Sequence, residues 1–181
     1  LIYAGKRGGK PSPKQRDISH KLIGLAREGR RVLRLKGGDP FIFGRGGEEA
    51  LTLVAARVDF RVIPGVSAGV GGLAYAGIPL THRDTNSAVT FVTGHNASGI
   101  VPDSVDWQSV AKGSDVLVVY MPLKHITQIS KMLIDAGRSS DEPAAVVSKA
   151  TTAKQKTVVS TLANVATDAA NAALSPPAIL I

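Results

Sequence analysis

Cysteine is absent from this chain of 181 residues, which excludes disulfide bonds and cysteine-ligated metal sites. Aromatic residues make up only 4% of it, and its lysines and arginines are scattered instead of grouped in blocks, so no nucleic-acid-binding module is recognisable. No apolar run approaches the roughly 20 residues of a membrane helix, and the N-terminal residues lack the apolar core of a signal peptide. These absences predict a soluble, cytoplasmic protein that binds neither nucleic acid nor membranes.

Familiar catalytic signatures are also missing. The four histidines, at positions 20, 82, 95 and 125, lie far apart in the sequence and have no acidic cluster beside them, so no metal site is expected. Ser67 lies in PGVSAG, which is not the Gly-x-Ser-x-Gly turn of a hydrolase. Neither a phosphate-binding Walker loop nor the Gly-x-Gly-x-x-Gly turn of dinucleotide folds is present. Hydrolysis and metal-dependent chemistry are therefore poor hypotheses.

What the chain does contain is a large apolar fraction and an excess of positive charge. Hydrophobic residues make up 44% of the sequence, enough for one large or two small α/β domains. The 22 Lys and Arg outnumber the 14 Asp and Glu, which gives a net charge of +8 and favours anionic partners. A polyanionic small molecule fits this charge as well as nucleic acid does.

Predicted strands alternate with predicted helices along the whole chain. Ser12 as N-cap and Pro13 at the first helical position begin a helix that should end near Gly29. The expected strands are 32–35, 60–63, 88–93, 116–121, 144–147, 157–160 and 178–181, and further helices are expected from 48 onward and at 67–76, 123–136 and 162–173. This order predicts an α/β fold with a largely parallel or mixed sheet.

Turn-forming residues at 77–86 suggest a linker between two α/β domains, residues 1–80 and 86–181. A cleft between such domains is where small ligands usually bind.

The glycine-rich stretch RLKGGDPFIFGRGGEE, residues 34–49, follows the first expected strand. Loops at the carboxyl ends of strands line the ligand crevice of α/β sheets. Gly37 and Gly38 would let a ligand approach the backbone, and Asp39 could accept hydrogen bonds from a ribose hydroxyl or an amine. Alternatively, the loop is a tight turn in which Asp39 caps nearby amides.

The second half of this stretch and the helix expected at 67–76 are open to similar alternatives. Arg45 precedes a helix, where it could clamp a carboxylate or simply lie in solvent. The 67–76 segment is built mainly from glycine and alanine, which form a poor helix unless a close approach to a neighbour or a ligand compensates.

Several motifs in series resemble one family. They are GKRGGK at 5–10, PSPKQRDI at 11–18, RLKGGDPFIFGRGGEEA at 34–50, VIPGVSAG at 62–69, YAGIPLTHRD at 75–84 and VTFVTGH at 89–95. Together they are similar to the S-adenosylmethionine (SAM)-dependent tetrapyrrole methyltransferases, above all to those that act on uroporphyrinogen III. The resemblance covers nearly the whole chain and is most specific over residues 5–95.

The resemblance implies that SAM methylates uroporphyrinogen III at two ring carbons, giving precorrin-2 and S-adenosylhomocysteine. A substrate with many carboxylates suits the basic chain, and the family implies a homodimer. Methylation of a later precorrin intermediate, or non-catalytic binding of an anion or nucleic acid, remains an alternative.

The family's functional residues can be carried over position by position. The resemblance implies cofactor contacts at Gly37, Gly38, Asp39, Ile42, Ser67, Ala68, Met121 and Ala150, where Ala150 replaces a family glycine. It implies substrate contacts at Arg34, Arg45 and Met121, and a proton-donating role for Lys6. Without the resemblance, Met121 would be interpreted as a core-packing residue, Lys6 as a solvated loop cation and Arg34 as a surface-facing strand residue.

Some family features lack a counterpart in this chain. The family's first strand, its Gly-Pro-Gly-Asp cofactor loop and the aspartate proposed as general base would precede Leu1, and the last strand would extend beyond Ile181. The N-terminal domain is therefore expected to be incomplete.

Overall fold

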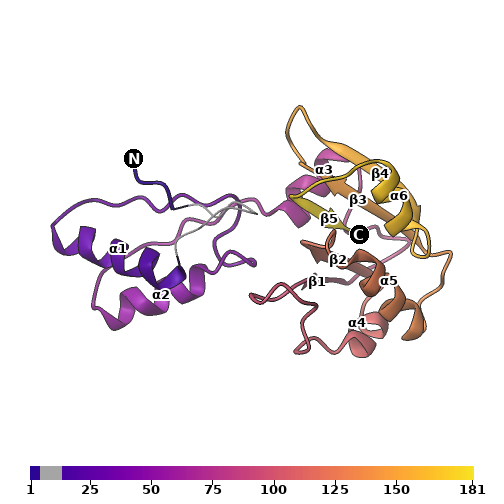
Figure 1. The fold of residues 1–181 in the computed structure, drawn as a ribbon, viewed down its shortest axis with the longest axis horizontal. Coiled ribbons are helices and arrows are strands. Elements are labelled where there is room, and N and C mark those ends of the chain that lie inside the picture. The colour runs from indigo at the N-terminus through magenta and orange to yellow at the C-terminus, as the bar shows by residue number, and fades with distance from the viewer. Residues whose placement is uncertain (5–13) are drawn as a thin grey trace. The chain divides into compact units, whose positions relative to one another are not determined.

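The computed structural model describes residues 1–4 and 14–181 (Figure 1), so the predicted catalytic residue Lys6 lies outside the described residues. The described chain forms two compact units, Leu1–Gly65 and Val66–Ile181. The boundary between the units along the chain lies upstream of the expected linker at 77–86, and the domain bounds 1–80 and 86–181 stay a prediction. In the described part of the chain, each helix is too short or too polar to cross a bilayer.

The first unit contains two α-helices, α1 (Gln15–Arg27) and α2 (Gly46–Ala55), which lie side by side (Figure 1). Helix α1 begins later than predicted, with Lys14 as its N-cap, and Ser12 lies outside the described residues. It ends as predicted, because Gly29 adopts the left-handed conformation (φ 74°) that closes a helix. Helix α2 begins at Gly46, two residues before the expected start at Glu48.

The strands predicted at 32–35 and 60–63 are wrong. Both segments are loops, and in the described part of this unit no strand is formed. A strand is stable only when a neighbouring strand satisfies its backbone N–H and C=O groups. Without such a partner the apolar side chains stay exposed, among them Leu33 at 82% and Leu35 at 78%.

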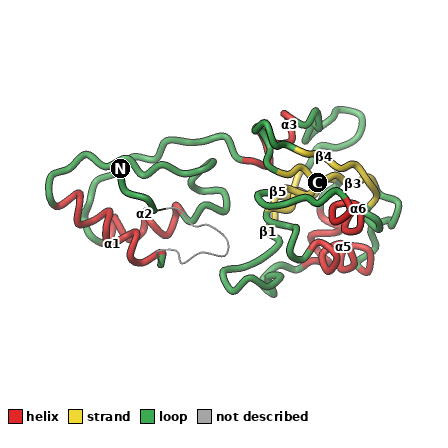
Figure 2. The backbone as a smooth tube through the Cα atoms, turned by 45° about the horizontal axis from the view of Figure 1, so that its top comes forward, coloured by secondary structure: helices red, strands yellow, loops and turns green. Residues whose placement is uncertain are grey.

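The second unit is built on a five-stranded mixed sheet (Figure 2). Its strands are β1 (Val89–Thr93), β2 (Val116–Tyr120), β3 (Pro143–Ser148), β4 (Lys156–Thr161) and β5 (Ala178–Leu180), in the spatial order β1-β2-β5-β3-β4. Only β1 and β2 pair in parallel, while β5 pairs antiparallel with both β2 and β3. The five strands predicted for this half of the chain, and the mixed α/β fold, are confirmed.

Different elements cover the two faces of the sheet. Helices α4 (Trp107–Gly113), α5 (Ile126–Asp135) and α6 (Val165–Asn171) form the core together with one face, to which Leu117, Val119 and Val146 belong. Helix α4 was not predicted. Because side chains alternate along a strand, Val118 and Tyr120 point to the opposite face. There β2 and β5 contact the π-helix η1 (Ala68–Gly72), which continues into α3 (Leu73–Tyr75).

Candidate functional site

The Asp39 side chain connects the Gly37-Gly38-Asp39 loop to the Pro64-Gly65 segment. One carboxylate oxygen accepts a hydrogen bond from the Phe41 N–H (2.9 Å) and the other accepts one from the Gly65 N–H (3.0 Å). These bonds, first that from Gly65 and then that from Phe41, lower the pKa of Asp39 because they favour the ionised form. The turn-capping alternative for Asp39 is therefore part of its role. Its contact with a cofactor stays a prediction.

Backbone packing brings the same two segments together. A Cβ built on Gly65 would lie only 2.8 Å from the carbonyl oxygen of Gly38, so glycine is required there by close approach. Gly37, in contrast, has no described atom within 4 Å of the position a Cβ would take, which leaves its backbone open to a ligand. Ile42 belongs to the same loop, and its N–H donates to the Asp39 carbonyl (3.4 Å).

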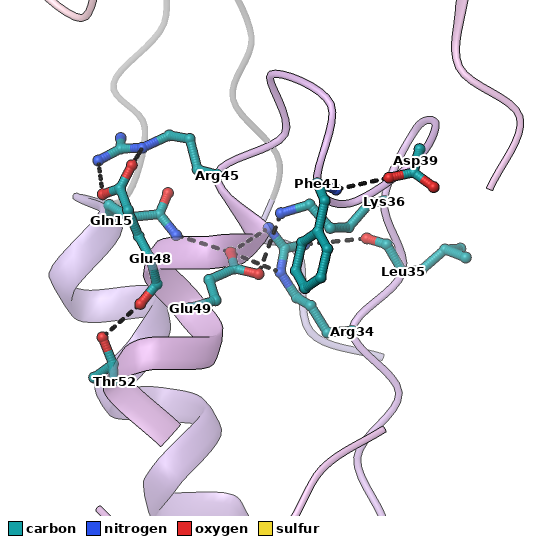
Figure 3. A network of polar contacts seen from close by, with 10 residues as sticks. All are labelled: Gln15, Arg34, Leu35, Lys36, Asp39, Phe41, Arg45, Glu48, Glu49 and Thr52. Carbon is teal, nitrogen blue, oxygen red and sulfur yellow. Dashed lines mark hydrogen bonds and ion pairs between the residues drawn. The ribbon is translucent and has the colours of Figure 1, made fainter. Parts of the chain in front are cut away.

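Glu49 of α2 is the centre of a polar network that joins α2 to α1 and to residues 34–36 (Figure 3). Its Oε1 accepts hydrogen bonds from Gln15 Nε2 (2.8 Å) and Arg34 Nη2 (3.2 Å), and its Oε2 accepts one from Lys36 Nζ (3.1 Å). Only 6% of the Glu49 side chain is exposed, against 27% for Arg34 and 13% for Lys36. Arg34, predicted to contact substrate, is thus ion-paired within its own unit.

The ionised form of Glu49 is favoured despite its burial. Burial is the largest single influence and raises the pKa, but the hydrogen bonds from Gln15 and Lys36 and the charges of Lys36 and Arg34 together outweigh it. The net pKa of Glu49 is therefore lowered below its ordinary value of 4.5.

Arg45, the second predicted substrate residue, is the N-cap of α2 and has a left-handed backbone (φ 59°). Its Nε and Nη2 atoms donate to the two carboxylate oxygens of Glu48 at 2.8 and 2.6 Å. This hydrogen-bonded pair raises the pKa of Arg45. Since 39% of the Arg45 side chain is exposed, its guanidinium is more accessible to a substrate carboxylate than that of Arg34.

In the second unit, the predicted cofactor segment Ser67-Ala68 leads into η1 and is anchored on β2. The Ser67 hydroxyl lies 2.7 Å from the Tyr120 hydroxyl, which also accepts a hydrogen bond from the Gly69 N–H (2.8 Å). Ser67 and Tyr120 are only 6% and 7% exposed. The close approach expected for this glycine- and alanine-rich helix is therefore made to a tyrosine that was not predicted as part of the site.

Met121 and Ala150 follow two strands that end at the same edge of the sheet. Both β2 and β3 run antiparallel to β5, so their carboxyl ends lie on one side, where ligands of α/β sheets commonly bind. Met121 has a positive φ of 56°, and so do Lys149 (49°) and Thr151 (64°) on either side of Ala150. Strained backbone of this kind clusters at functional sites. The Ala150 Cβ would lie 2.9 Å from a Cβ built on Gly72 of η1.

Two residues, Glu49 in the first unit and Tyr120 in the second, were not predicted as site residues from the sequence. Glu49 had the signal of an acidic residue at a helix N-terminus, which does not reveal burial, and Tyr120 was read only as part of a strand. Within residues 1–4 and 14–181, no group of His, Asp and Glu side chains could hold a metal ion.

The whole chain is similar to known proteins. The chain is 63% identical over 181 residues to a uroporphyrinogen-III C-methyltransferase of Sinorhizobium sp, covering all of this chain and 65% of that protein. It is 49% identical over 180 residues to a siroheme synthase of Neisseria meningitidis serogroup C, covering 99% of this chain and 37% of that protein. The chain thus spans between about a third and two-thirds of the length of these relatives.

A solved structure has the same fold. The crystal structure of uroporphyrin-III C-methyl transferase from Thermus thermophilus, complexed with S-adenosylhomocysteine, matches with a TM-score of 0.79 and 37% identity, covering 99% of this chain and 74% of that chain. The model of the family described as Tetrapyrrole (Corrin/Porphyrin) Methylases matches residues 3–166. On this match and on the relatives above, the chain belongs to the tetrapyrrole methylase family.

Proposed function

We propose that this chain is part of a SAM-dependent methyltransferase that converts uroporphyrinogen III to precorrin-2 by methylating two ring carbons. The observation that carries the proposal is the 63% identity, over the entire chain, to a uroporphyrinogen-III C-methyltransferase. Because the chain spans 65% of that relative, the activity is proposed for the full-length protein and not for residues 1–181 alone.

The proposed cofactor contacts are Gly37, Gly38, Asp39, Ile42, Ser67, Ala68, Met121 and Ala150. SAM would supply an electrophilic methyl group: the bond between this group and sulfur would break as a ring carbon of the substrate attacks, and the methylated substrate would then lose a proton from another position. The chain's own part is to bind and align the reactants, which can supply most of the rate gain. The open backbone at Gly37 and the shared strand edge that carries Met121 and Ala150 support this assignment.

The residues proposed to contact the substrate differ in how accessible their side chains are. The Arg45 side chain is 39% exposed and that of its carboxylate partner Glu48 is 56% exposed, so a substrate carboxylate could replace Glu48 in a bidentate pair. Arg34 is more enclosed and shares the buried Glu49 with Lys36, which supports a mainly structural role. Lys6 as proton donor remains a proposal carried by the family resemblance alone.

The experiment that tests the function is methyl transfer by the purified full-length protein. It would be incubated anaerobically with SAM and uroporphyrinogen III, and the tetrapyrrole products would be identified by mass spectrometry. We expect a gain of two methylene masses and formation of S-adenosylhomocysteine. Methylation of a later precorrin, with none of uroporphyrinogen III, would support the alternative within the same family.

We further propose that the protein works as a homodimer in the cytoplasm on a small-molecule tetrapyrrole, and not on nucleic acid. The family resemblance supports the dimer, and the scattered positive charge suits a polycarboxylate. Light scattering of the purified protein tests the dimer. Steeply salt-dependent binding to nucleic acid, with no binding of SAM, would favour the non-catalytic alternative instead.

A further inference from the structure

The Tyr120 hydroxyl connects two segments that are far apart in the sequence. It lies 2.7 Å from the Ser67 Oγ and accepts the Gly69 N–H at 2.8 Å, and these contacts span more than 50 residues of chain. All three residues are buried. The Tyr120 ring is itself held by Phe91 of β1, which meets it edge to face at a centroid distance of 6.0 Å and an angle of 88°.

The backbone of Tyr120 is fixed independently of its side chain. It is the last residue of β2 and pairs with Thr93 of β1 and Ile179 of β5, and its carbonyl accepts the Gly94 N–H at 2.7 Å. The next residue, Met121, leaves the strand with a left-handed φ of 56°. Tyr120 therefore connects the hydrogen-bonded end of β2 to Ser67 and Gly69, which its hydroxyl contacts.

What the hydroxyl holds is the beginning of a π-helix. The first N–H groups of a helix have no partner within the helix, and in η1 the Ser67 side chain makes no capping bond to them. The Tyr120 hydroxyl satisfies the Gly69 N–H in its place. Gly69 makes this approach feasible, because a Cβ there would lie 2.5 Å from the hydroxyl oxygen. Single π-helical turns are rare in proteins, but many of those that occur lie at functional sites.

We propose that Tyr120 is a positioning residue for the cofactor site. By fixing Ser67 and the first turn of η1 to the end of β2, it sets the placement of Ser67-Ala68 relative to Met121. This inference rests on the proposed function, which makes both segments SAM contacts, and it deepens that function by naming the residue that determines their spacing.

The test is Tyr120→Phe in the full-length protein, which removes the hydroxyl and keeps the ring. Calorimetry would give the affinity for S-adenosylhomocysteine, and steady-state kinetics would give KM for SAM and for uroporphyrinogen III separately. Loss of the hydroxyl should weaken S-adenosylhomocysteine binding about five- to tenfold and raise KM for SAM to match. KM for uroporphyrinogen III should stay within about twofold, a split that a general loss of folding would not produce.

Tyr75→Phe is the matched control, because Tyr75 is 73% exposed on α3 of the same unit. It should leave all three constants unchanged. If Tyr120→Phe binds S-adenosylhomocysteine as tightly as the wild type, the positioning role is wrong while the proposed function stands. If the wild type itself binds no S-adenosylhomocysteine, both fail.

A measurement on the wild type covers the case in which Tyr120→Phe does not fold. Hydrogen exchange of the Gly69 amide, followed by NMR, should be strongly protected and should slow further when S-adenosylhomocysteine binds. Rapid exchange of this amide, or protection that does not change when S-adenosylhomocysteine binds, would overturn the proposal.

Discussion

Replacing Glu49 with glutamine should destabilise the first unit by removing one negative charge from a buried network. The change keeps the size of the side chain and one acceptor oxygen, which can still serve Gln15 and Arg34. The second oxygen becomes an NH₂ group that faces the ammonium of Lys36, now a donor against a donor. Two cations are then left without their shared carboxylate.

The size of the effect follows from the burial of the three charges. Removing one partner of a buried ion pair costs about 3–5 kcal/mol. We expect the lower end, about 3 kcal/mol, because 27% of the Arg34 side chain remains exposed to water and the glutamine retains one acceptor. A loss of this size raises the fraction of locally opened α1 and α2 roughly a hundredfold.

Hydrogen exchange with mass spectrometry measures this opening directly. Peptides from α1 and α2 should exchange roughly a hundredfold faster in Glu49→Gln than in the wild type, while peptides from β2 and β3 keep their rates. Glu48→Gln is the matched control, since it changes the adjacent residue of the same helix at a side chain that is 56% exposed. Exposed ion pairs contribute only about 0–1 kcal/mol, so its effect should be a few-fold at most.

The pH dependence provides an independent check. The pKa of Glu49 is lowered in the folded protein, so its stabilising contribution is complete above the ordinary value of 4.5 and is lost as the pH falls through the folded pKa. The difference between wild type and Glu49→Gln should therefore be constant near neutral pH and shrink in acid. Equal exchange of α1 and α2 in both proteins at neutral pH would refute the idea that Glu49 organises this unit.

Further predictions concern the loop, its surroundings and a control position in α1. Asp39→Ala should weaken S-adenosylhomocysteine binding more than tetrapyrrole binding, because it releases the loop from Gly65; calorimetry showing unchanged affinity would remove Asp39 from the site. Arg45→Ala should raise KM for uroporphyrinogen III and spare S-adenosylhomocysteine binding, whereas equal loss of both would mean that its pair with Glu48 is structural. Gly65→Ala should cost about 1–3 kcal/mol in urea denaturation, because its Cβ would press on the Gly38 backbone. Gly24→Ala, in α1 with open space around it, should instead stabilise by about 1 kcal/mol, and a similar loss at both positions would contradict the packing argument.

Local patterns in the sequence were sufficient for the five strands of the second unit. Apolar runs such as 116–121 and 144–147 became β2 and β3, because each lies between neighbours that complete its hydrogen bonds. The same kind of pattern at 32–35 and 60–63 produced no strand, since a run of apolar residues cannot supply its own partner strand. Helix α4, which is seven residues long, was missed.

The candidate site divides in the same way. The family could be identified from sequence, and the glycine-rich loop and the Ser67-Ala68 segment could be predicted as cofactor contacts, because both steps depend on residue types in a fixed order. The polar contacts made by Glu49 and Tyr120 could not be predicted from sequence. The Glu49 carboxylate and the Tyr120 hydroxyl act on residues 13 to 53 positions away along the chain, and burial is what makes them effective. Distance in the sequence says nothing about such contacts, and only the tertiary fold brings the partners together and excludes water from around them.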